Sequence, residues 1–166
     1  MHILATTSAS IDDLVEPVDL AQTPGDMVVL SFTDSDLAAL AGAWRAECGQ
    51  AGGAALPSLR LASLRDLRHP MSVDLWLDKV GAQAKVIVLR LLGGLDWWQP
   101  GHLADEPAER LAELARMRGI ALAVLPGEDR DDPRLAGLST VPPDEAAEWL
   151  ACFRHVVGDG LVDVAL

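Results

Sequence analysis

The sequence has 166 residues, of which half are hydrophobic, so it has room for one folded domain with a substantial core. Thirteen Lys and Arg residues against 25 Asp and Glu residues give a formal net charge of −12, which repels nucleic-acid phosphates and anionic membrane surfaces. We therefore expect neither a nucleic acid nor a membrane as partner.

Five apolar, strand-like runs recur along the chain at the spacing of βα units. They cover residues 3–6, 27–32, 59–64, 85–92 and 120–125. The last two runs are apolar on both faces apart from Arg90, which is typical of central parallel strands covered by helices on both sides. The runs therefore predict a mostly parallel sheet.

Helical patterns fill most of the intervals between these runs. Four helices are expected: from residue 34 or 35 to 49, from Pro70 to about 81–84, from about 107 to 119, and from about 143 onward. Residues 8–25 carry few apolar positions and two prolines, so we expect mostly irregular structure there. Residues 126–133 are expected to form an acidic turn.

Alternating strands and helices predict an α/β domain with three layers. We expect a mostly parallel, five-stranded, flavodoxin-like (Rossmann-like) sheet with helices on both faces and, numbering strands along the chain, the order 2-1-3-4-5. Residues 1–158 are expected to form this single domain. The apolar residues 159–166 are expected to be a tail that leads to the rest of a longer subunit.

The two cysteines, Cys48 and Cys152, have no companions at metal-ligand spacing, and their apolar neighbours predict buried free thiols in a reducing compartment. Residues 1–7 lack the basic start and long apolar run of a signal peptide, and no apolar stretch is long enough to span a bilayer. We therefore expect a cytoplasmic protein.

Ligands of open α/β sheets collect beyond the carboxyl ends of the strands, so the candidate binding residues lie there. The candidates, for a ligand or a partner, are Thr6, Thr7, Arg65, Arg68, His69, Arg90, Gly93, Gly94, Trp97 and Trp98. The two threonines could form a phosphate-binding turn, although turn and capping hydroxyls are commoner.

The basic residues Arg65, Arg68 and His69, with Arg60, form the best electrostatic candidate for an anionic ligand or acidic partner. The alternative is that these arginines pair with Asp66, Asp74 or other nearby carboxylates on a solvated face and that His69 is a helix-entry residue.

Two adjacent tryptophans after the fourth run cannot both point into one core, so one of Trp97 and Trp98 is expected to be exposed. An exposed ring beside Gly93 and Gly94 could stack on a planar ligand. The alternative is that the tryptophans plug the end of the sheet or dock on a neighbouring domain. We identify no catalytic residue and no metal site in the sequence.

Four stretches, residues 2–13, 59–79, 86–101 and 119–143, resemble the amino-terminal region of the large, CobN-type subunit of aerobic cobaltochelatase. The most specific pieces are RLLGG at residues 90–94 with the tryptophan pair, LPGEDRDDP at 125–133 and LSTVPP at 138–143. The resemblance implies ATP-dependent insertion of cobalt into hydrogenobyrinic acid a,c-diamide during cobalamin biosynthesis. It implies cobalt, ATP and magnesium as requirements of the whole complex, and no cofactor in this part.

The resemblance also implies partners, namely the remainder of the large subunit and two smaller ATPase-type subunits. Such large subunits are several times longer, so we expect either a piece of one or a free-standing homologue of its first domain. The expected role is a structural and interaction domain that is inactive alone. The alternative is a module that binds the corrinoid precursor or another planar cofactor where the strand order reverses, through Trp97 or Trp98 and through Arg65 or Arg90. A standalone enzyme that uses a flavin or a nucleotide lacks the expected glycine-rich loop.

Overall fold

A parallel sheet of four strands organises the described part of the chain. The computed structural model describes residues 16–50, 56–98, 107–128 and 132–162. The strands are β1 (Met27–Ser31), β2 (Leu59–Ser63), β3 (Val86–Leu91) and β4 (Ala121–Pro126). All three pairings between them are parallel, as predicted.

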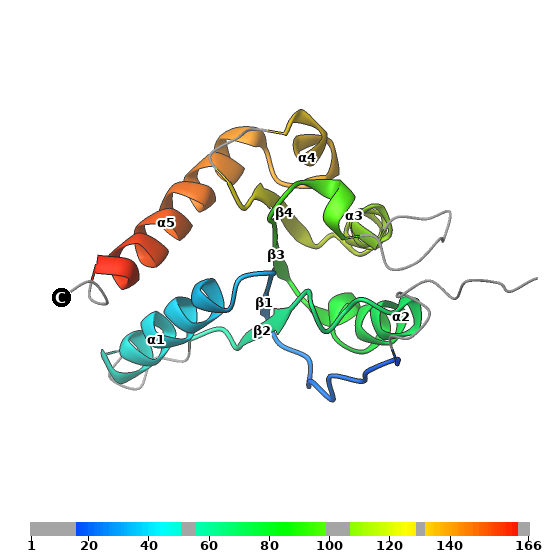
Figure 1. The fold of residues 1–166 in the computed structure, drawn as a ribbon, viewed down its shortest axis with the longest axis horizontal. Coiled ribbons are helices and arrows are strands. Elements are labelled where there is room, and N and C mark those ends of the chain that lie inside the picture. Colours follow the sequence, from blue (N-terminus) through cyan, green and yellow to red (C-terminus); the bar gives the residue numbers. More distant parts are fainter. Residues whose placement is uncertain (1–15, 51–55, 99–106, 129–131, 163–166) are drawn as a thin grey trace, which may run out of the picture.

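Helices cover both faces of this sheet and form the outer layers. They are α1 (Asp34–Gln50), α2 (Pro70–Lys79), α3 (Pro107–Arg118), α4 (Pro133–Leu138) and α5 (Pro143–Val162), with short 3₁₀ turns η2 (Gly81–Gln83) and η3 (Leu95–Trp97). Figure 1 shows α1 and α5 on one side of the sheet and α2 and α3 on the other. The predicted three-layer α/β architecture is therefore confirmed.

The two faces of the sheet are buried to different extents. Toward α2 and α3, the strand residues Val28, Leu30 and Ile87 are completely buried. Toward α1 and α5, Val88 is only half-buried, and the only buried residue of α1 is Asp36. The main core therefore lies between the sheet and the pair α2 and α3.

The strand order differs from the predicted one. The observed order is β2-β1-β3-β4, with Val29 of β1 opposite both Leu61 of β2 and Val88 of β3. The prediction placed residues 59–64 beside 85–92, which is wrong because β1 lies between them. In the described sheet β2 is an edge strand, and a charged, half-buried residue such as Arg60 is typical of that position. The order of the four strands is still flavodoxin-like, with its reversal between β1 and β3.

The strand predicted at residues 3–6 lies outside the described residues. Residues 133–138 form α4, a helix that was not predicted and that follows the predicted turn at 126–133. Asp132 caps this helix and Pro133 suits its first turn. Cys48 and Cys152 are exposed, so the prediction of buried thiols is wrong.

The helix α5 continues through the predicted boundary at residue 158, and the division of the chain stays a prediction. No helix in the described ranges is long and apolar enough to cross a membrane.

Candidate functional site at the carboxyl edge of the sheet

The basic residues after β2 do not converge on one anion site. His69 caps α2, since its Nδ1 accepts a hydrogen bond from the Met71 N–H at 3.1 Å. Arg65 Nη1 lies 3.5 Å from Asp34 Oδ2, and both side chains are more than half exposed. Arg68 is also exposed.

The partners of the neighbouring charged residues are also settled. Arg60 donates to the Thr23 carbonyl at 2.8 Å and to Thr23 Oγ1 at 3.0 Å. Asp74 forms an ion pair with Arg110 of α3. The alternative that these arginines pair with nearby carboxylates fits Arg65, whose partner is Asp34 in the first turn of α1. His69 is the predicted helix-entry residue.

Arg90 occupies a buried position at the reversal of strand order. Its Nη1 lies 3.0 Å from Asp36 Oδ2, with only 12% of the Arg90 side chain and 5% of the Asp36 side chain exposed. Ser31 Oγ, on the residue opposite Arg90, donates to the same Asp36 oxygen at 2.9 Å. Arg90 therefore neutralises a carboxylate within the chain.

The same guanidinium also contacts two further elements. Arg90 Nη2 donates to the Gly127 carbonyl after β4 at 3.1 Å, and its central carbon lies 4.7 Å from the ring centroid of Phe153 on α5. Arg90 thus holds β3, α1, the loop after β4 and α5 together. Its contacts are those of a positioning residue.

The tryptophan pair is divided between core and solvent, as predicted. Trp98 is 2% exposed and its Nε1 donates to the Leu67 carbonyl at 3.1 Å, so it closes the end of the sheet against the loop after β2. Trp97 is 72% exposed. Its ring lies over Gly93, which has a φ of +82°, and no side chain at residue 93 would fit beneath the ring.

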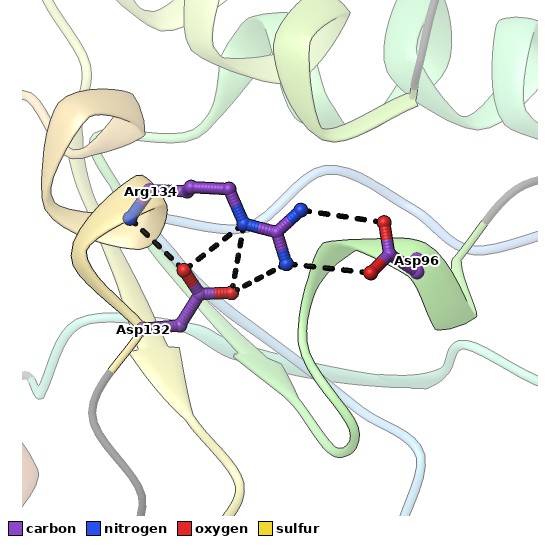
Figure 2. Close-up of polar contacts among 3 residues, drawn as sticks. All are labelled: Asp96, Asp132 and Arg134. Atoms are coloured by element: carbon purple, nitrogen blue, oxygen red, sulfur yellow. Dashed lines mark hydrogen bonds and ion pairs between the residues drawn. The ribbon is translucent and has the colours of Figure 1, made fainter.

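An ion-pair cluster, drawn in Figure 2, joins the loop after β3 to the start of α4. Arg134 Nη1 lies 3.3 Å from Asp96 Oδ1, and Arg134 Nη2 lies 2.8 Å from Asp132 Oδ2. Asp132 Oδ1 also accepts the Arg134 N–H at 3.0 Å, which caps α4. Hydrogen bonds to Asp132, and then to Asp96, raise the pKa of Arg134 above its usual range.

This cluster was not predicted from the sequence. Asp132 directly before Pro133 is a recognisable helix-cap signal. The contact between Asp96 and Arg134 joins residues 38 apart, and nothing in the local sequence predicts it.

A cavity of about 380 Å³ opens beside this cluster, with Gly93 and Gly94 in its lining. Its charged lining residues are Asp96, Glu128, Asp132 and Arg134, three carboxylates against one guanidinium. Its net charge is therefore negative, which suits neither a phosphate nor a carboxylate ligand.

Among the described residues, no group of three or more His, Cys, Asp or Glu side chains is placed to hold a metal ion. Thr6 and Thr7 lie outside the described residues. The remaining candidates surround the carboxyl edge, and most of their polar groups are engaged within the chain.

The parallel sheet, its reversal of strand order and its two helical layers define a Rossmann-like α/β domain. No family model matches the chain. It is 39% identical over 155 residues, 93% of its length, to the aerobic cobaltochelatase subunit CobN of a Sinorhizobium species. It is 40% identical over 157 residues to the same subunit of Pseudomonas aeruginosa. The chain is therefore a CobN-type sequence.

The chain spans only about a tenth of these relatives, 11% and 12% of their lengths. A solved structure, the catalytic subunit of cobaltochelatase from Mycobacterium tuberculosis, is similar with a TM-score of 0.47 and 22% identity. That similarity covers 73% of this chain and 8% of the solved one.

Proposed function

We propose that this chain serves as an interaction domain near the amino terminus of a cobaltochelatase large subunit. In this proposal the complete complex inserts cobalt, its substrate, into hydrogenobyrinic acid a,c-diamide in cobalamin biosynthesis. ATP and magnesium act through two smaller ATPase-type subunits, and the complex works in the cytoplasm. Residues 1–158 form the domain, and residues 159–166 connect it to the remainder of the subunit.

The observation that carries this proposal is the CobN similarity over 93% of the chain. The side chains at the carboxyl edge of the sheet support it. The cations Arg90 and Arg134 there each contact carboxylates of the chain itself. In contrast, two large apolar side chains stand free, with Leu92 43% and Trp97 72% exposed. Exposed leucine and tryptophan side chains on the same loop suit contact with another protein surface.

The second candidate is a module that binds the corrinoid precursor or another planar cofactor. Its support is the exposed Trp97 ring beside the glycine-lined cavity. The precursor carries carboxylates, and the nearby cavity is itself negatively charged, while Arg90 is already paired. Electrostatics therefore favours the interaction role.

Cobalt insertion by a chimeric subunit tests this proposal. A CobN-type subunit that carries this chain in place of its own matching segment is compared with the same subunit lacking the segment. Metal insertion is followed by the absorption change of the macrocycle in the presence of the smaller subunits, cobalt and Mg-ATP. We expect insertion by the chimera, little insertion without the segment and none by this chain alone. Insertion by the isolated chain, or full activity after deletion, would refute the proposal.

A further inference from the structure

An apolar groove of about 470 Å³ lies between α1 and α5, on the less completely covered face of the sheet. Its floor includes Val29 and Val88, and its walls include Leu40 and Trp44 of α1 and Phe153 of α5. Apart from Glu47, the lining residues carry no charge. The groove therefore offers a hydrophobic surface that the described residues leave open.

The floor of the groove is the face of the sheet and not its edge. The backbone groups of β1 and β3 are already paired in the ladder, so an added strand would find no hydrogen-bond partners there. An α-helix satisfies its own backbone and presents only side chains, as in other helix-in-groove complexes. The occupant that fits is thus a helix with one apolar stripe.

The helices that form the walls are acidic. The helix α1 carries three acidic residues and one arginine, and α5 carries four acidic residues and one arginine. Within α1, Asp36 pairs with Arg90 and Asp34 pairs with Arg65, so most of the unbalanced negative charge of the two walls lies on α5. A helix with Lys and Arg beside its apolar stripe complements these walls, whereas a second copy of this chain would bring like charges together.

We infer that the groove receives a basic amphipathic helix from the remainder of the CobN-type subunit, which rests on the proposed function. The chain spans only 11% and 12% of the CobN relatives, so their sequences have ample length to supply such a helix. The helix lays its apolar side chains on Leu40, Trp44 and Phe153, and its cations face α5 and Glu47 of α1.

The chain contains an internal pair of reporters for this inference. Cys152 and Cys48 are both exposed, but only Cys152 lines the groove. A helix in the groove should slow modification of Cys152 by a maleimide at least fivefold and leave Cys48 unaffected. The probes are overlapping 20-residue peptides that cover the Sinorhizobium CobN outside the 155 matched residues.

Two matched substitutions separate apolar docking from charge attraction. Ala43 lines the groove and Ala46 is exposed on the same helix without lining it. Both A43E and A46E add one negative charge. We expect A43E to weaken binding of the protecting peptide at least tenfold, although its charge attracts a basic helix. A46E should bind as the parent does, and equal melting temperatures of the two variants establish that both are folded.

The inference is overturned if no peptide protects Cys152, if only acidic or non-amphipathic peptides protect it, or if A43E and A46E behave alike. It is also overturned if Cys152 becomes protected by raising the protein concentration alone, with a dimer in sedimentation. Cobalt insertion by the chimeric subunit is scored separately, so failure of the peptides with an active chimera removes only this inference.

Discussion

Replacing Arg90 with leucine tests the buried ion pair at the reversal of strand order. The substitution leaves the Asp36 carboxylate, 5% exposed, with the Ser31 hydroxyl as its remaining described partner. Breaking a buried pair from one side costs about 3–5 kcal/mol. We therefore expect the free energy of unfolding of R90L to fall by that amount, and the melting temperature by roughly 6–20 °C for a domain of this size.

A double-mutant cycle with D36L separates the pair from its surroundings. Each single variant leaves one buried charge unpaired, whereas R90L/D36L leaves none, so its loss should be smaller than the sum of the two by about 1–3 kcal/mol. Urea unfolding followed by far-UV circular dichroism measures all three. The exposed ion pair between Arg65 and Asp34 provides the control, because R65L should lower the free energy of unfolding by only about 0–1 kcal/mol. Additive effects, or a loss below about 1 kcal/mol in R90L, would refute the reasoning.

Three further outcomes follow from local geometry. G93A combines a positive φ with a collision against the neighbouring tryptophan ring, whereas G119A has a positive φ and open space. Thermal melts should therefore show a loss of about 1–3 kcal/mol in G93A and a smaller one in G119A. D132A removes the cap of α4 and should cost about 0.5–2 kcal/mol in urea unfolding, with unchanged stability contradicting the cap. The Lys85 ammonium, and then Ser58, hold the pKa of Asp26 well below its ordinary 3.8, so Asp26 stabilises the fold above that pH. This stabilisation is lost as the pH falls from there toward the lower folded-state pKa, and urea midpoints of D26N should lack that part of the acid dependence.

The strands of the described sheet could be predicted closely from the sequence. Residues 27–32, 59–64, 85–92 and 120–125 are apolar runs bounded by turn residues, and each matches a strand of the structure to within one residue at either end. The order of the strands could not be predicted, because the apolar pattern of a strand shows which of its faces are buried but not which strand lies beside it. Residues 59–64 would bury the same faces beside either neighbour. The charged Arg60 in that run was the available signal for an edge strand, and the structure leaves it half-buried.

The candidate site was predictable only where the signal was local. Adjacency of Trp97 and Trp98 was enough to predict that one ring is exposed, and Pro70 was enough to place His69 at a helix entry. The partner of Arg90 lies 54 residues away on another element, and a lone arginine in an apolar strand does not say which carboxylate it meets. Whether the candidates bind a ligand or a partner stays a prediction.

The most direct test of the interaction role is a fluorescence titration of the chain with hydrogenobyrinic acid a,c-diamide, with a W97F variant as control. Trp97 is 72% exposed, so a stacked macrocycle would quench its emission. Our account predicts no saturable quenching in either protein. Saturable quenching that is present in the parent chain and lost in W97F would contradict it and assign the carboxyl edge to the macrocycle.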